Sequence, residues 1–337
     1  MNYKEFVLNN QKYSFLKENE HLGNNIMLLT LGGSHSYGLN QENSDLDVRG
    51  IALERPNELL GLDIFEQFEN KETDTTIYAF RKIIKLLSSC NPNCIEILAT
   101  NPEHILIMTN EGKLLRDNIN LFLSQKASRS FSGYARQQLR RLKNALARDN
   151  YTQPEKEEHI FQSINIEHLK EFYAPFTEEE ISLYIDKSNK EDFETELFLD
   201  INLKHFPLRD YRNIQAEMSN VITEYGNLHH RNKKKDDLHL NKHISHLFRL
   251  YIMGAEILEG VGVHTFRKDD KEFLLDLKTG KYVIDDRYDF IEELLDPYIK
   301  RFEYAKQNSP LPKEPNDKDI NNLMIDICRK GVFEIGL

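Results

Sequence analysis

The first hundred residues alternate between short apolar runs and amphipathic segments. Apolar runs predict strands at about 26–31 and 46–53, and the alternating Thr, Ile, Tyr and Phe positions of 72–80 predict a third strand. Helical spacing predicts three helices, at 5–20, 80–89 and 94–100. The apolar run at 104–108 fits either a strand or a helix. Together these elements predict a small mixed sheet with helices packed on it.

From about residue 111 the periodicity becomes mostly helical. Six helices are predicted, at 128–148, 178–188, 209–230, 238–259, 286–305 and 317–330, with a hairpin at 272–284 around Thr279–Gly280. The polar interval 150–237 has the weakest pattern and is interpreted as an insertion. We therefore expect an α+β fold, with a catalytic core over 1–110 and a helical nucleotide- and substrate-binding domain over 111–337.

The segment between the first two strands carries the chemistry. Gly33–Gly38 (GSHSYG) follows the first strand, and Ser44–Gly50 (SDLDVRG) leads into the second. On a strand, Asp45 and Asp47 would point to the same face about 6.5–7 Å apart. Two carboxylates held in this way can ligate a pair of divalent cations ~3.5–4 Å apart. The Gly33–Ser34 turn has little side-chain bulk, so its N–H groups can approach a phosphate closely.

Each half of this pattern alone is more typical of an ordinary loop or turn. The ordered combination of strand, Gly-Ser, a polar gap, Ser-Asp-x-Asp and a second strand is far more specific. It predicts a triphosphate cradle beside a magnesium site. Arg49 has the same strand parity as Asp45 and Asp47, so it could neutralise carboxylate charge, contact a phosphate or form a structural ion pair.

This arrangement resembles the nucleotidyltransferases of the DNA polymerase beta superfamily. It is most similar to the RNA-repair, RNA-ligase-associated polymerase family, whose pattern is matched at Gly33, Ser34, Tyr37, Gly38, Ser44, Asp45, Asp47, Arg49 and Gly50. Four other segments also resemble the family: NPNCIEIL, SFSGYARQQL, the helix at 238–259, and FLLDLKTGKY. The resemblance implies a polymerase beta-like core followed by a helical domain that closes over the site.

The resemblance also implies the reaction. A nucleoside monophosphate would pass from a nucleoside triphosphate, ATP among them, to an acceptor hydroxyl, with release of pyrophosphate. Two Mg²⁺ ions are the expected cofactors, with Mn²⁺ as the alternative. The acceptor implied by the family is an RNA end. The alternatives are AMP or UMP transfer to a protein or small molecule, as a regulatory modification, and a non-catalytic nucleotide-binding protein.

A two-metal site usually needs a third carboxylate, which can also take the proton of the attacking hydroxyl. Asp74 on the third predicted strand is our candidate, with Glu72 in reserve and Asp63 as a weaker rival. Asp74 would complete one metal site beside Asp45 and Asp47 and accept the proton. The alternative is a charge at a strand edge with no catalytic role.

Nucleotide-binding residues are expected on two segments. Gly33, Ser34 and Ser44 belong to the loop motif. Further along the chain Lys242, His246 and Arg249 fall at i, i+4 and i+7 of a predicted helix, which places them in one stripe. Arg and Lys bind phosphates through charge and geometry, so this stripe is predicted to contact the triphosphate or the substrate. A solvated polar face is the alternative.

The charge distribution bears on the acceptor. The chain of 337 residues has a formal net charge of −11, which argues against broad non-specific adhesion to nucleic acid. Residues 126–148, however, contain seven Lys or Arg and no acid, so this helix is predicted to face phosphate. Its candidate acceptor-binding residues are Tyr134, Arg136, Gln138, Arg140 and Arg141. The net acidity instead favours a discrete acceptor.

The remaining composition places limits on location. No apolar run approaches the ~18 residues that suggest a membrane-spanning helix, and the first residues lack a secretory signal pattern. Three cysteines are an odd number in a chain of this size and fit thiols in a reducing cytoplasm. A cytoplasmic protein with no membrane partner is expected. The sequence does not indicate an oligomeric state.

Overall fold

The structure is a computed structural model that describes residues 2–42, 44–150, 155, 180–187, 195–212, 214–216, 218–219, 237–283 and 290–334. The chain forms two compact units. Unit 1 comprises 1–136, 245–279 and 292–337, and unit 2 comprises 137–244 and 280–291. Each unit is described by itself. The functional boundary predicted near residue 110 stays a prediction.

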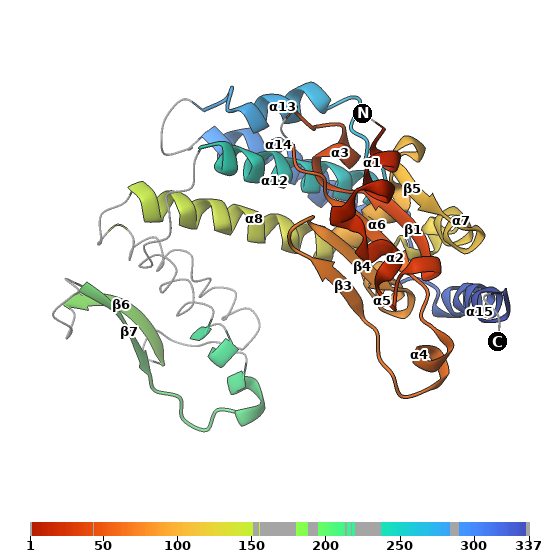
Figure 1. Cartoon of the computed structure of the whole chain (residues 1–337). Coiled ribbons are helices and arrows are strands. Elements are labelled where there is room, and N and C mark those ends of the chain that lie inside the picture. Colours follow the sequence, from red (N-terminus) through yellow and green to blue (C-terminus); the bar gives the residue numbers. More distant parts are fainter. Residues whose placement is uncertain are drawn as a thin grey trace. The chain divides into compact units, whose positions relative to one another are not determined.

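Unit 1 contains a five-stranded mixed sheet with the order β3-β4-β2-β1-β5. The strands are β1 (Ile26–Leu31), β2 (Val48–Ala52), β3 (Gln67–Asn70), β4 (Thr75–Ala79) and β5 (Ile105–Met108). β2 and β4 are parallel, and the other neighbouring pairs are antiparallel (Figure 1). The predicted small mixed sheet and the α+β class are confirmed.

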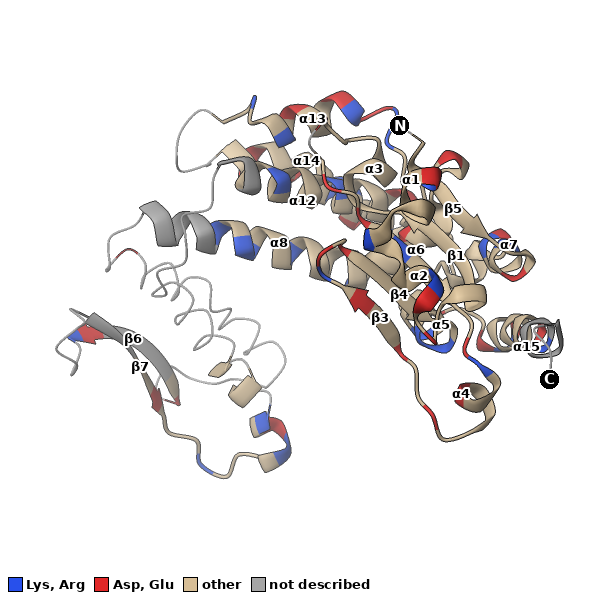
Figure 2. Cartoon of the chain, viewed as in Figure 1, with Lys and Arg blue, Asp and Glu red and all other residues tan. Residues whose placement is uncertain are grey.

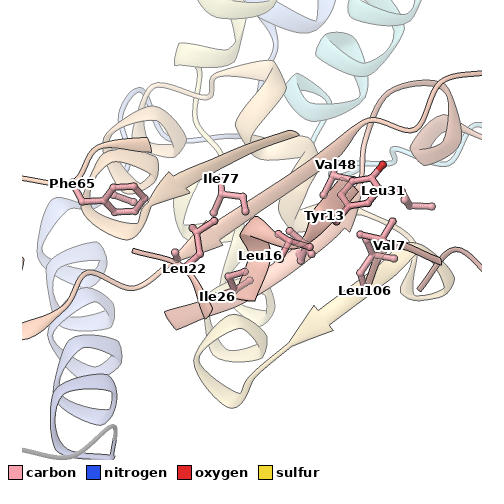
Figure 3. Close-up of a cluster of buried hydrophobic side chains, with 13 residues drawn as sticks. Val7, Tyr13, Leu16, Leu22, Ile26, Leu31, Val48, Phe65, Ile77 and Leu106 are labelled. Carbon is pink, nitrogen blue, oxygen red and sulfur yellow. The ribbon is translucent and has the colours of Figure 1, made fainter. Parts of the chain in front are cut away.

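The N-terminal helices cover one face of this sheet. Side chains of α1 (Tyr3–Asn9) and α2 (Phe15–Glu18) form a core cluster with those of the strands, shown in Figure 3. Val7 and Leu16 are both buried in this cluster. The single helix predicted at 5–20 is wrong, because Asn10 ends α1 and its side chain accepts a hydrogen bond from the Lys12 N–H, starting a separate 3₁₀ turn.

Further helices hold the sheet in place. α5 (Phe80–Ser88) contacts β2 and β4, and α7 (Asn110–Asp117) contacts β1 and β5. α6 (Pro92–Ala99) begins with a capping Asn91 and a proline, a favourable start for a helix. The short elements are α3 (Gly33–Tyr37), α4 (Pro56–Leu60) and the 3₁₀ turns η1 (Gln11–Tyr13), η2 (Gly23–Asn25), η3 (Pro102–His104) and η4 (Ile119–Phe122).

Unit 1 also contains all or part of four long helices. These are α8 (Lys126–Asn150), α12 (Asp237–Leu258), α14 (Phe290–Gln307) and α15 (Asp317–Glu334), and α8, α12 and α14 each contribute residues to both units. Phe248 packs edge-on against Tyr298 at 5.2 Å between ring centroids, which joins α12 to α14. None of the described helices is long and apolar enough to cross a membrane.

The hairpin predicted at 272–284 is wrong for its described residues. The segment forms α13 (Lys271–Thr279), with Leu274 and Leu277 buried at helical spacing. Gly280, at φ +80°, follows the end of the helix. Glycine adopts this conformation easily, so the Thr279–Gly280 signal marks a helix end instead of a hairpin turn.

In unit 2 a two-stranded ribbon pairs β6 (Ile181–Lys187) with β7 (Thr195–Ile201), in register from Ile181 opposite Ile201. The helix predicted at 178–188 is therefore wrong, because ISLYIDK alternates with period two and favours a strand. Ile181 and Ile214 share a small apolar cluster. Helical residues within 208–219 agree with the start of the helix predicted at 209–230, whose remainder lies outside the described residues, as does most of 150–237.

Candidate active site

The site lies at one end of the unit 1 sheet, where β1 ends and the parallel strands β2 and β4 begin. The Gly32 N–H donates to the Asp47 carbonyl at 2.8 Å, and the Val48 N–H donates to the Asp74 carbonyl at 3.1 Å. α3 starts directly after Gly32. The fold therefore gathers the Gly-Ser turn, the Asp-x-Asp segment and Asp74 at one place, although each aspartate precedes its strand instead of lying within it.

Asp47 and Asp74 form an acidic pair. Their carboxyl groups share a hydrogen bond, and both face the Arg49 guanidinium. Arg49 Nη2 lies 3.0 Å from Asp74 Oδ1 and 3.7 Å from Asp47 Oδ1, and Nη1 donates to the Asp74 carbonyl. The Asp47 side chain is 20% exposed and that of Asp74 is 60% exposed. One arginine thus serves two carboxylates, which leaves surplus negative charge.

The proton affinities of the acidic pair diverge. Burial raises the pKa of Asp47 to about 7, and its hydrogen bond with Asp74 adds to this rise. The same hydrogen bond, followed by the Arg49 charge, lowers the pKa of Asp74. In the absence of a cation, a shared proton therefore resides on Asp47 near neutral pH.

Asp74 also has an unusual backbone, with φ +41°. Aspartate is one of the few residues other than glycine that adopts such a conformation with little strain. Asp74 occupies the last position of the β3–β4 turn, in which Asn70 Oδ1 accepts hydrogen bonds from the N–H groups of Glu72 and Thr73. This turn presents the Asp74 carboxylate toward Asp47.

Asp45 is exposed, and its negative charge adds to the rise in the pKa of Asp47. It lies outside the acidic pair. No group of three or more His, Cys, Asp or Glu able to hold a metal occurs among the residues that the structure describes. The metal-binding roles of Asp45, Asp47 and Asp74 stay predictions.

The two rival carboxylates lie elsewhere. The Glu72 side chain is 74% exposed and pairs with Lys12 at 3.8 Å, and the Asp63 carboxylate accepts a hydrogen bond from the Asn57 side chain. Asp74 is the one of these three candidates that the structure places beside Asp47. It therefore remains our choice for the third carboxylate.

The Gly-Ser turn touches the acidic pair directly. Gly33 has φ +52°, and a Cβ atom built on it would lie 1.6 Å from Asp47 Oδ2. Glycine is thus required both by the backbone conformation and by the space available. Ser34, the next residue, is half-buried. The phosphate-binding roles predicted for Gly33 and Ser34 are compatible with this placement.

The other loop residues have contacts of their own. The Ser44 hydroxyl accepts a hydrogen bond from the Gln41 N–H at 2.8 Å, so in this structure it shapes the loop. His35 is buried, packs edge-on against Tyr3, and has a pKa lowered by burial. The nucleotide contact predicted for Ser44 stays a prediction.

The three residues predicted to form one stripe on α12 differ in environment. Lys242 is exposed, His246 is half-buried, and Arg249 is 3% exposed. Arg249 forms an ion pair with Glu96, and its guanidinium lies 3.6 Å from the ring centroid of Tyr37. Arg249 is therefore committed to contacts within the protein. The nucleotide contacts predicted for Lys242, His246 and Arg249 stay predictions.

On α8, two of the candidate acceptor-binding residues make internal contacts. The Tyr134 hydroxyl accepts from Asn91 Nδ2 at 3.0 Å, and the buried Gln138 lies 3.0 Å from the Nδ1 atom of His243. Arg140 is half-buried, while Arg136 and Arg141 are exposed. Lys and Arg are spread along this helix in Figure 2. Arg136 and Arg141 are the candidates best placed to meet an acceptor from solvent.

Glu96 received no predicted role, although it lies in the NPNCIEIL segment that resembles the family. Its signal was the one charged residue in the otherwise apolar or uncharged helix PNCIEILA. A buried carboxylate in an apolar segment needs a partner, and here Arg249 and Tyr37 provide it. The partners themselves could not be inferred, because they come from distant parts of the chain.

Comparison with known families found a match over the region that contains the site. Residues 9–164 match the family model RlaP, the RNA repair pathway DNA polymerase beta family. This part of the chain is similar to that family. The match contains the Gly-Ser turn, all three aspartates, the sheet and α8, and it confirms the resemblance carried by the motifs.

The family match and the five-stranded mixed sheet are together consistent with a polymerase beta-like core in this region. The family name supports a polymerase beta-like nucleotidyltransferase in RNA repair. The segments at 238–259 and 273–282, which also resemble the family, lie beyond the matched residues. Neither the curated proteins nor the solved structures include a match to this chain.

Proposed function

We propose that this protein is a metal-dependent nucleotidyltransferase that moves a nucleoside monophosphate from a nucleoside triphosphate to an RNA end. The observation that carries the proposal is the acidic pair of Asp47 and Asp74, which touches Gly33 and has one arginine for two carboxylates. Like charges so close together require a shared proton or a cation. A site built in this way attracts cations.

The donor set suits Mg²⁺ or Mn²⁺, because hard divalent cations prefer carboxylate oxygens. Asp47 and Asp74 would hold the ion, and Asp45 is the proposed third ligand. Two ions are proposed, as in other two-metal sites. When bound, they would neutralise charge that develops on the transferred phosphoryl group and the leaving pyrophosphate.

The protein's own groups would align the reactants. The lack of a side chain at Gly33 lets the triphosphate approach the backbone N–H groups of the turn, and Ser34 adds a hydroxyl donor. The acceptor oxygen bonds to the α-phosphorus while the bond from this phosphorus to the bridging oxygen breaks. Pyrophosphate leaves, and the acceptor proton passes to a carboxylate.

We assign that proton to Asp74, because its side chain is 60% exposed and can be reached by an acceptor from solvent. Its lowered pKa makes it the weaker base of the pair, so the assignment depends on position instead of proton affinity. Catalysis would come mostly from alignment and charge neutralisation.

RNA is favoured as the acceptor by two observations. The matched family acts in an RNA repair pathway by its name, and α8 presents exposed arginines in a chain of net charge −11. The exposed Arg136 and Arg141 could follow a phosphate backbone. AMP or UMP transfer to a protein or a small molecule is the alternative.

The test is incubation with each α-labelled nucleoside triphosphate, Mg²⁺ or Mn²⁺, total RNA and total protein. The proposal expects label in RNA, dependent on the metal and absent with Asp47→Asn. Label in the protein fraction or in a small molecule would favour the alternative acceptors. No transfer from any nucleoside triphosphate would contradict the nucleotidyltransferase proposal.

A further inference from the structure

Three polar side chains from distant segments meet in the interior of unit 1. They are Tyr37 at the end of α3, Glu96 on α6 and Arg249 on α12. In the sequence, 59 positions separate Tyr37 from Glu96, and 153 separate Glu96 from Arg249. The Tyr37 hydroxyl donates to Glu96 Oε2, and Arg249 Nη1 donates to Glu96 Oε1. Each oxygen of the Glu96 carboxylate therefore has a partner.

This cluster is electrically balanced. One carboxylate faces one guanidinium, and that guanidinium also stacks on the Tyr37 ring. Burial raises the pKa of the Tyr37 phenol, so it stays a neutral donor. A buried ion pair resists loss of either member, because the remaining charge would be buried without a partner.

α3 needs such support. It is five residues long, too short to be stable by its own hydrogen bonds. It begins with Gly33, which touches Asp47, and ends at Tyr37. Any shift of Tyr37 moves Gly33 relative to the acidic pair, since one short turn of helix connects them.

Further contacts hold the same end of α3. The Arg267 N–H donates to the Tyr37 carbonyl at 3.0 Å, and Lys278 Nζ donates to the Leu39 carbonyl at 2.7 Å. Gly38, at φ +71°, lies under Phe266, where a Cβ atom would be 2.6 Å from the ring. Residues of the segment 249–278 thus contact the end of α3 and the residues that follow it at several points.

We propose that Tyr37, Glu96 and Arg249 form an anchor that positions the Gly33–Ser34 turn beside the acidic pair. This inference rests on the proposed function, and it makes Arg249 a positioning residue instead of a nucleotide ligand. Arg249 and the other residues that contact the end of α3, Phe266, Arg267 and Lys278, lie beyond the family match, which ends at residue 164. The turn of the matched region is therefore held by a later part of the chain.

The test compares Tyr37→Phe and Arg249→Lys in the full-length chain with the control Glu54→Gln. Tyr37→Phe removes only the hydroxyl that reaches Glu96. Glu54 is also a buried carboxylate paired with an arginine, Arg81, but it follows the opposite end of β2 from the acidic pair. Hydrogen exchange of peptides covering 32–40 and the kinetics of nucleotide transfer are measured for each protein.

The anchor predicts that both variants speed exchange at 32–40 by about tenfold, as loss of one hydrogen bond to a charged group allows. It also predicts that both raise the KM for nucleoside triphosphate more than they lower kcat, whereas Glu54→Gln changes neither readout at this site. Arg249 as a direct ligand instead predicts a raised KM in Arg249→Lys with normal exchange and no effect of Tyr37→Phe. That result would overturn the anchor.

The two proposals fail in different ways. If the wild-type protein transfers no nucleotide, the proposed function fails, and the exchange measurement alone decides whether α3 is anchored. If exchange at 32–40 is unchanged in Tyr37→Phe, or if Glu54→Gln alters it equally, the anchor is wrong even where transfer is observed. Faster exchange with unaltered kinetics would also overturn the positioning role.

Discussion

The acidic pair and the anchor lie at opposite ends of α3, and both combine arginine with carboxylate. In the anchor, Glu96 and Arg249 are matched one to one and are almost fully buried. In the acidic pair, Arg49 faces both Asp47 and Asp74, and the Asp74 side chain is largely exposed. The charges of the anchor are balanced without a ligand, whereas the acidic pair has an excess of negative charge.

This difference separates structural from functional polar clusters. A balanced buried cluster stabilises one conformation, while an unbalanced accessible cluster raises the pKa of a carboxylate and favours binding of a cation. The pKa of Asp47, raised by burial and by Asp74 to about 7, is the measurable sign of that imbalance. Four substitutions test the comparison, beginning with the largest expected effect.

Asp47→Asn should lower nucleotide transfer by about three orders of magnitude or more, because it removes a central ligand of the proposed metal site. Steady-state transfer rates provide the measurement, and circular dichroism checks the fold. Glu72→Gln is the matched control, since Glu72 is an exposed carboxylate that makes a surface ion pair with Lys12. Near-normal activity in Asp47→Asn would remove the basis of the mechanism.

Gly33→Ala should lower transfer by roughly a hundredfold, because the added Cβ forces the turn and the Asp47 carboxylate apart and misaligns the reactants. The matched control is Gly133→Ala on α8, where a Cβ would meet nothing within 4 Å. The control should keep full activity and gain up to about 1 kcal/mol of helix stability. Equal losses in both variants would show that the turn has no special role.

Reversing the exposed charges with Arg136→Glu and Arg141→Glu should weaken RNA binding and flatten its salt dependence. Each lost phosphate contact removes about 0.7 from the slope of log affinity against log salt for a single strand. Nucleoside triphosphate affinity should stay unchanged. Lys85→Glu with Lys271→Glu reverses two other exposed charges as a control. If the salt dependence of RNA binding is unaltered in the α8 variant, the acceptor binds to another surface.

Asp47→Asn should also change how stability depends on pH in metal-free buffer. Because the folded-state pKa of Asp47 is raised, its contribution to the free energy of unfolding is full near pH 4 and is lost as pH rises through about 7. The variant should lack this loss, with a net gain at pH 8 on the order of 1–3 kcal/mol relative to wild type. Denaturant unfolding at pH 4 and pH 8 measures it, and parallel pH curves would contradict the raised pKa.

The sequence predicted the parts of the fold that local patterns determine. The apolar run 26–31 forms β1, and 80–89 forms α5 nearly as expected. β3 was missed, because QFEN is polar and pairs only at the sheet edge. The segments 178–188 and 272–284 were assigned to the wrong element, because short apolar patterns fit either period.

In the site, too, the sequence predicted some residues and not others. The ordered motif identified Gly33 and Asp47, and the search for a third carboxylate on the next predicted strand identified Asp74; the fold brings all three together. The burial of Arg249 was not predicted, because helical spacing says which residues share a face but not what covers that face. Only the tertiary structure shows that α3 and α6 cover this face of α12 and that Glu96 is the ion-pair partner of Arg249.

Manganese binding followed by electron paramagnetic resonance tests the central claim most directly. Asp47, Asp74 and Arg49 are held by the starts of β2 and β4, so the cation site can be measured without nucleotide. The account predicts that wild type and Glu96→Gln bind Mn²⁺ alike, while Asp47→Asn loses most of the binding. Wild-type binding in Asp47→Asn, or an equal loss in Glu96→Gln, would contradict it.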